Sequence, residues 1–184
     1  MTKKSILLLL SALLFIISIN KIIAQDKFFT KSGSVSFFSY TLVEDIKADN
    51  NQVLSIINTG NGKIVIKMLM RSFHFKKALM QEHFNENYIE SYKFPKAIFK
   101  GVIKNFSKLE KKDVAKIEGI LTIRGVSKKI STVAKITQSN RKIILKGKFK
   151  VRVADFDIRI PTVVSKNISK TIIISFELNH KLYK

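Results

Sequence analysis

The chain has 184 residues and a formal net charge of +21 at pH 7, from 34 lysines and arginines against 13 aspartates and glutamates. This length accommodates one domain with a substantial core. Because the chain has no cysteine, disulfides and a nucleophilic cysteine are excluded. Only five of the basic residues are arginines, whose side chains are best suited to reading nucleic-acid bases. The charge therefore indicates a solvated, lysine-rich surface and no specific nucleic-acid binding.

The amino terminus has the pattern of a secretory signal peptide. Lys3 and Lys4 precede an uncharged run over 5–20 that is rich in leucine and isoleucine, and Ala24 precedes Gln25. We expect cleavage between these last two residues, which leaves one domain over 25–184 and exports the protein, to the periplasm if the source is bacterial. The alternative is a membrane anchor, although the run is short for a span of about 20 residues.

Alternation of apolar and polar residues predicts that most of the remaining chain is β-strand. In 141–153, for example, Phe149 and Val151 fall on one face, whereas Lys148 and Lys150 fall on the other. Turn-forming residues at the ends of such runs separate them. Strands are expected at 33–41, 52–58, 63–71, 96–106, 114–124, 128–138, 141–153 and 168–178.

One segment has helical periodicity instead. Met80, Phe84 and Tyr88 recur at four-residue intervals, which predicts a short helix over about 76–90 with an apolar stripe. A second stripe at the same spacing is acidic and is expected to face solvent: Glu82, Glu86 and Glu90.

The predicted fold class is therefore all-β, with a single antiparallel barrel of roughly eight strands and one short helix that flanks or caps it. Each strand has one apolar face, and closure into a barrel buries all of these faces together. Most lysines then face water. A sandwich of two sheets is the structural alternative. The periodicity is compatible both with a barrel filled by its own side chains and with one that encloses a ligand.

Catalytic motifs are missing from the sequence. It has no G-x-S-x-G elbow, no P-loop and no H-E-x-x-H helix, so we expect neither an enzyme nor a cofactor. His83, Glu86 and Glu90 have spacings that could present metal ligands on one side of a helix. A single histidine among acids is more typical of a helix surface, and no metal is expected.

Three segments resemble the YceI-like, polyisoprenoid-binding family of exported bacterial proteins. They are EHFNENYIESYKFPKAIFKG (82–101), IEGILTIRGVSKKI (117–130) and FKVRVADFDIRIP (149–161). The resemblance covers essentially all of 25–184. It implies a lipocalin-like barrel without catalytic activity, whose apolar channel holds an isoprenoid chain such as that of a polyprenyl phosphate or a quinone. Asp157 departs from the pattern, because glycine is frequent at that position.

The resemblance also implies which residues contact the lipid. The apolar channel is expected to be lined by Ile66, Met68, Met70, Leu121, Ile123, Phe149, Val151, Ile172, Ile174 and Phe176. The lid or mouth is expected to contain Phe73, Met80, His83, Phe84 and Tyr88. The expected partner is an isoprenoid or another long-chain apolar lipid, with transient contact to a membrane surface left open. The alternative is a self-filled barrel whose basic exterior binds an anionic polymer or a membrane.

Overall fold

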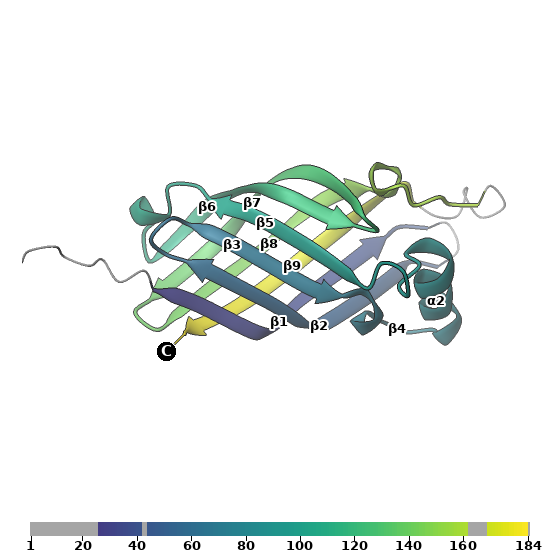
Figure 1. Cartoon of the computed structure of the whole chain (residues 1–184), viewed down its shortest axis with the longest axis horizontal. Coiled ribbons are helices and arrows are strands. Elements are labelled where there is room, and N and C mark those ends of the chain that lie inside the picture. Colours follow the sequence, from purple (N-terminus) through teal and green to yellow (C-terminus); the bar gives the residue numbers. More distant parts are fainter. Residues whose placement is uncertain (1–25, 42–43, 162–168, 184) are drawn as a thin grey trace, which may run out of the picture.

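Eight long antiparallel strands close into one barrel in the computed structural model, which describes residues 26–41, 44–161 and 169–183 (Figure 1). The strands follow the order β1-β9-β8-β7-β6-β5-β3-β2, and pairing of β1 with β2 closes the ring. This confirms the predicted all-β, lipocalin-like barrel with one short helix. The long strands are β1 (Lys27–Ser39), β2 (Ile46–Asn58), β3 (Lys63–Leu69), β5 (Lys96–Ile103), β6 (Lys112–Ile123), β7 (Val126–Ser139), β8 (Lys142–Arg152) and β9 (Thr171–Leu182).

The first two strands are longer than predicted. In β1 the pairing register with β2 shifts between Thr30 and Gly33, and both Lys31 and Ser32 are exposed. Such a bulge breaks the two-residue period, so alternation alone detects only the part of the strand after it. A two-residue strand, β4 (His74–Phe75), extends the sheet beside β2.

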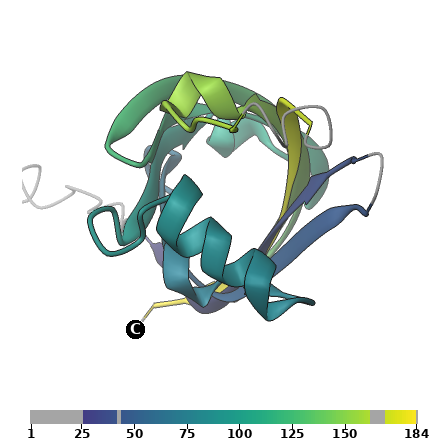
Figure 2. The ribbon, with the colours of Figure 1, turned by 90° about the vertical axis from the view of Figure 1, so that its right-hand side faces the viewer.

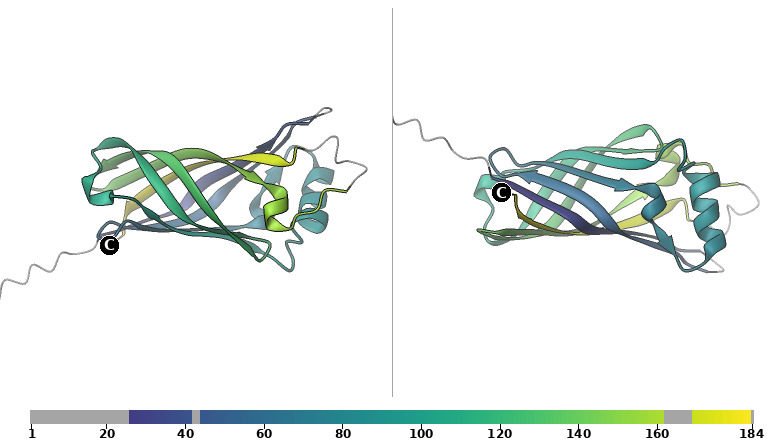
Figure 3. Two further views of the ribbon diagram at one scale, coloured as in Figure 1. Left: turned by 90° about the horizontal axis from the view of Figure 1, so that it is seen from above. Right: turned by 60° about the horizontal axis from the view of Figure 1, so that its bottom comes forward.

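The helical segment consists of α2 (Ala78–His83) followed directly by one π-helical turn, η2 (Phe84–Tyr88). We call residues 78–88 the capping helix. It lies across one opening of the barrel (Figure 2), whereas β1 begins and β9 ends at the opposite end (Figures 1 and 3). Three 3₁₀ turns complete the described elements: η1 (Met70–Ser72), η3 (Phe106–Lys108) and η4 (Val153–Phe156).

The expectation that Glu90 is a solvated member of an acidic stripe is wrong. Its side chain is only 25% exposed, and its backbone has left the helix with a φ of 52°. The carboxylate forms ion pairs with Lys93 and with Arg124, which comes from the turn between β6 and β7. Glu82 and Glu86 are exposed, as predicted.

The end of the barrel opposite the capping helix is filled by side chains. Ile57, Ile103, Leu145 and Leu178 are at most 1% exposed there and form a closed floor. A buried polar pair is also present: the Nε2 atom of His180 lies 2.8 Å from Ser55 Oγ, and its Nδ1 atom lies 3.2 Å from the Ile143 carbonyl oxygen. The expected signal peptide (1–24) and residue 168 of the last predicted strand lie outside the described residues.

Candidate functional site

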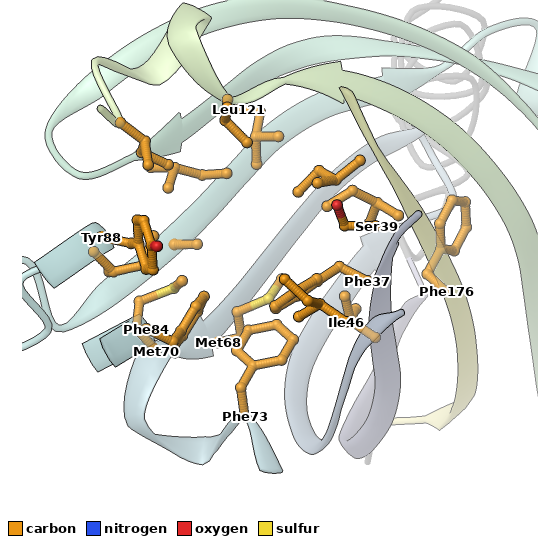
Figure 4. A pocket seen from close by; sticks show the side chains of 18 of the residues that line it. Phe37, Ser39, Ile46, Met68, Met70, Phe73, Phe84, Tyr88, Leu121 and Phe176 are labelled. Atoms are coloured by element: carbon orange, nitrogen blue, oxygen red, sulfur yellow. The ribbon is translucent and has the colours of Figure 1, made fainter. Parts of the chain in front are cut away.

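The half of the barrel beneath the capping helix encloses a cavity of about 420 Å³ (Figure 4). Its wall is made by inward-facing residues of the strands, and the capping helix contributes to its roof. Nearly all of the lining side chains are aliphatic or aromatic. A cavity with such a lining favours apolar ligands. The capping helix therefore covers a hollow space and does not fill the barrel.

All but one of the residues expected at the channel or its mouth border this cavity. From the strands and η1 these are Ile66, Met68, Met70, Leu121, Ile123, Phe149, Ile172, Ile174 and Phe176. From the roof and its approach they are Phe73, Met80, His83, Phe84 and Tyr88.

Val151 is the exception and does not border the cavity. It is 5% exposed and belongs to the hydrophobic core. The strand β8 ends one residue later, and η4 folds the chain back over this end of the barrel (Figure 3). Alternation places Val151 on the correct face of the strand but does not reveal this turn. Val153, the next inward residue, borders the cavity instead.

Sequence reasoning missed the contribution of β1 and β2. Val35, Phe37 and Ser39 from β1 and Ile46 from β2 line the cavity, as does Phe99 from β5. The spacing of the three β1 residues is the signal that could have found them, because they occupy every second position of a predicted strand. Segments outside the strands also contribute, through Thr41, Glu44, Ile158 and Ile160.

Four phenylalanines attach the capping helix to the barrel wall. Phe84 of η2 stacks on Phe37 of β1 with ring centroids 5.4 Å apart, and it contacts Phe75 at 5.0 Å and Phe73 at 5.7 Å. Phe37 also contacts Phe73 and Phe75 at 5.5 and 5.6 Å. Aromatic pairs at these separations are stabilising beyond the area that they bury. This aromatic cluster therefore fixes one side of the roof.

Glycines make room for two rings of the cavity wall. A Cβ atom at Gly101 or Gly119 would lie 2.6 or 2.7 Å from Cζ of Phe99, and one at Gly147 would lie 2.6 Å from Cζ of Phe176. These distances are too short for any side chain larger than hydrogen. The rings of Phe99 and Phe176 can therefore lie against the backbone of the neighbouring strands, which leaves the centre of the barrel open.

Arg124 joins three segments at the rim of the cavity. Its guanidinium pairs with Glu90 after the capping helix, and its Nη1 donates to the Asp157 carbonyl oxygen at 2.9 Å. The guanidinium also lies 5.5 Å from the ring centroid of Phe94. Hydrogen bonds from Lys93 and Arg124 lower the pKa of the Glu90 carboxyl below its usual value. This cluster fixes the side of the roof that the aromatic cluster does not reach.

Few of the described residues that border the cavity are polar. They are Ser39, Thr41, Glu44, His83, Tyr88 and Thr132. Burial raises the pKa of the Tyr88 hydroxyl, so this group is neutral at physiological pH. Glu44 forms an ion pair with Lys77 at the start of the capping helix.

Within the described ranges, no group of three or more histidine, cysteine, aspartate or glutamate side chains is arranged to hold a metal ion. None of the helices in that part of the chain has both the length and the apolar character needed to cross a bilayer.

Comparisons with solved structures show the same fold in three other proteins. A polyisoprenoid-binding domain from Saccharophagus degradans superposes with a TM-score of 0.76 at 14% identity, covering 86% of this chain and 99% of that one. BcnA of Burkholderia cenocepacia gives 0.68 at 13% identity, covering 83% and 96%. A YceI protein of Campylobacter jejuni gives 0.61 at 18% identity, covering 79% and 90%.

Comparison with curated proteins gives no match. The model of the YceI-like domain family, however, matches residues 25–180. This range includes the eight long strands, apart from the last two residues of β9, and it includes the capping helix and the residues that border the cavity. The chain therefore belongs to the YceI-like domain family.

Proposed function

We propose that this protein is a non-enzymatic binding protein that carries or sequesters an isoprenoid-type lipid in its barrel. The observation that carries the proposal is the apolar cavity of about 420 Å³ beneath the capping helix. Family membership supports it, and so does the description of the Saccharophagus degradans neighbour as a polyisoprenoid-binding domain.

Burial of the lipid tail supplies the free energy of binding in this proposal. Each isoprene unit has five carbons, and at ~0.8 kcal/mol per buried carbon it contributes roughly 4 kcal/mol before the costs of association. Affinity then rises with tail length for as long as the tail remains inside the cavity. Branched, flexible isoprenoid chains suit an apolar wall that contains Met68, Met70 and Met80, because methionine side chains adapt to irregular shapes.

Export is part of the proposal and rests on the residues of the amino terminus. The pattern of Lys3, Lys4, the apolar run and Ala24 is typical of a cleaved signal peptide. Sequencing of the mature protein from a bacterial periplasmic fraction should begin at or near Gln25. An intact amino terminus recovered in membranes would replace export with anchoring.

The test of lipid binding is organic extraction of the purified protein followed by mass spectrometry, with two variants of adjacent residues. Ile66 borders the cavity, whereas Val65 is 41% exposed on the other face of β3. Ile66→Trp should narrow the cavity and reduce the amount of co-purified lipid. Val65→Trp adds the same ring outside the barrel and should retain it.

Wild-type protein that yields no lipid and binds no added prenol would reject the proposal. Binding of an anionic polymer or anionic vesicles that weakens steeply with salt would then favour the basic exterior as the functional surface, since tail burial responds little to ionic strength.

A further inference from the structure

Among the described residues of the cavity wall, one buried hydroxyl has no hydrogen-bond partner. Ser39 lies at the end of β1 and is 2% exposed. Its Oγ forms no hydrogen bond within the described part of the chain. The side chain borders the cavity together with Phe37 and Ile46 (Figure 4). Buried hydroxyls in folded proteins are nearly always satisfied, because an unpaired one destabilises the fold. This hydroxyl therefore lacks a partner that a ligand in the cavity could supply.

The threonine hydroxyls among the described lining residues do not share this property. Thr41 Oγ1 donates to the Glu44 carbonyl oxygen and accepts from the Glu44 amide. Thr132 Oγ1 lies 3.4 Å from the carbonyl oxygens of Val133 and Lys148. Ser39 is thus distinct among the described lining residues in having a buried side-chain oxygen without a protein partner.

The charges of the lining argue against an anionic head group beside Ser39. No lysine or arginine is among the described residues that border the cavity. Glu44 is acidic and already pairs with Lys77, and the imidazole of His83 belongs to an exposed residue of the capping helix. Transfer of a phosphate or carboxylate into an apolar site without a cation is strongly unfavourable.

From these observations we infer that the ligand carries an uncharged hydrogen-bonding head group, such as a hydroxyl, ketone or amide, which binds Ser39 Oγ inside the cavity. The inference rests on the proposed function and deepens it. It also orients the ligand, because Ser39 lies at the capped end of the barrel and the tail must point toward the floor. Ile64 and Ile117 border the cavity and receive the tail there.

The test measures competition against Nile red, an uncharged apolar dye, for the wild type, Ser39→Ala and a matched control, Ser36→Ala. Ser36 lies three residues earlier in β1 and does not border the cavity. The three competitors are geranylgeraniol, the hydrocarbon in which hydrogen replaces its hydroxyl, and geranylgeranyl phosphate. Thermal melting verifies that each variant folds, and loss of an unpaired hydroxyl should not lower the stability of Ser39→Ala.

Ser39→Ala should weaken binding of the alcohol about tenfold and change binding of the hydrocarbon by no more than about twofold, the size expected for one buried hydrogen bond. Ser36→Ala should change neither. The phosphate should bind the wild type at least about tenfold more weakly than the alcohol, because its charge has no partner in the cavity.

Equal effects of Ser39→Ala on the alcohol and the hydrocarbon would overturn the inference while leaving lipid binding intact. Phosphate that binds as tightly as the alcohol would also overturn it. Failure of all three competitors to displace the dye would reject the proposed function itself, so the two failures are distinguishable.

Discussion

Arg124 donates a hydrogen bond of 2.9 Å from Nη1 to the backbone carbonyl oxygen of Asp157, which lies 33 residues later in the chain. Both residues have left-handed backbone conformations, with φ of 49° and 54°. Glu90, the ion-pair partner of Arg124, has a φ of 52°. Such conformations are unfavourable for residues other than glycine, and they persist where surrounding contacts stabilise them. The hydrogen bonds of Arg124 provide those contacts at the rim of the cavity.

Arg124→Ala should loosen the roof on this side. It removes the hydrogen bond to Asp157 and the ion pair with Glu90, and we expect it to lower the free energy of unfolding by roughly 1–2 kcal/mol. Amide hydrogen exchange should become faster over 90–94, where Lys93 and Phe94 donate backbone hydrogen bonds to the Glu90 carbonyl oxygen. Lys93→Ala is the control, because it removes only the exposed ion pair with Glu90. If both variants behave alike, Arg124 does not fix the roof.

Gly147→Ala should push Phe176 into the cavity. The new Cβ would lie 2.6 Å from Cζ of Phe176 and 3.0 Å from the Val133 carbonyl oxygen, so the ring must move. Overpacking of this kind costs typically about 1–3 kcal/mol. We expect a matching loss of stability in denaturant titrations and weaker binding of Nile red. Gly60→Ala, in an exposed turn, should change neither quantity. Unchanged dye binding in Gly147→Ala would mean that Phe176 moves away from the cavity.

The buried His180 predicts a pH dependence of stability. Burial lowers its pKa from 6.5 to about 4, so the folded state binds its proton less readily than the unfolded state does. The contribution of His180 to the free energy of unfolding is therefore fully present above pH 6.5 and is lost as the pH falls toward 4. A shift of this size corresponds to about 3 kcal/mol. Denaturant titrations between pH 7 and pH 4 measure it.

His180→Asn should remove most of that slope even though it lowers stability at pH 7. His74→Gln is the matched control, because His74 is exposed and its loss should leave the slope unchanged. The lowered pKa values of Glu90, Glu118 and Glu177 act in a different window, below the ordinary value of 4.5 for a glutamate. An unaltered slope between pH 6.5 and 4.5 in His180→Asn would contradict the assignment.

The barrel was predictable from the sequence because its determinants are local. Lys148 and Phe149 occupy opposite faces of a strand whatever that strand pairs with, and Met80, Phe84 and Tyr88 define a helix face without any tertiary information. The glycine preference of the family at position 157 also has a local cause, since the backbone there has a φ of 54°. Aspartate tolerates this conformation better than most residues do.

The contents of the barrel were not predictable in the same way. Whether inward side chains meet or leave a cavity depends on where eight strands lie relative to one another, and Gly147 and Phe176 interact only because β8 pairs with β9. Val151 occupies an inward-facing position by its periodicity, but it does not border the cavity, because it lies at the end of β8, where η4 packs over the barrel. The contact of His180 with Ser55 joins residues 125 positions apart, and no local sequence pattern predicts it.

Leu121 and Lys148 test the two faces of the barrel. Leu121 is 5% exposed and borders the cavity, whereas Lys148 is exposed on β8. Leu121→Lys places an ammonium without a partner in an apolar cavity and should cost several kcal/mol or prevent folding. Lys148→Glu should change the free energy of unfolding by less than about 1 kcal/mol. Circular dichroism melts compare the two, and equal sensitivity would reject the assigned faces.

Removal of bound lipid should lower the melting temperature of the wild-type protein by several degrees. By the coefficient measured for small core cavities, ~24 cal/mol per Å³, an empty cavity of about 420 Å³ would cost on the order of 10 kcal/mol. A cavity already formed by the fold costs less, but the sign is the same, and a ligand that binds only the folded state adds stability in proportion to the logarithm of its concentration.

Calorimetry should therefore give a higher melting temperature for lipid-loaded than for delipidated protein, and added geranylgeraniol should restore it. Ile66→Trp, whose cavity is narrowed by the introduced ring, should respond less to both treatments, whereas Val65→Trp should respond as the wild type does. This comparison separates occupancy of the cavity from adsorption of lipid on the exterior, because both variants present the same basic surface. A melting curve of the wild type that is unchanged by delipidation and by added prenol would mean that the cavity is stable when empty and that lipid does not bind there.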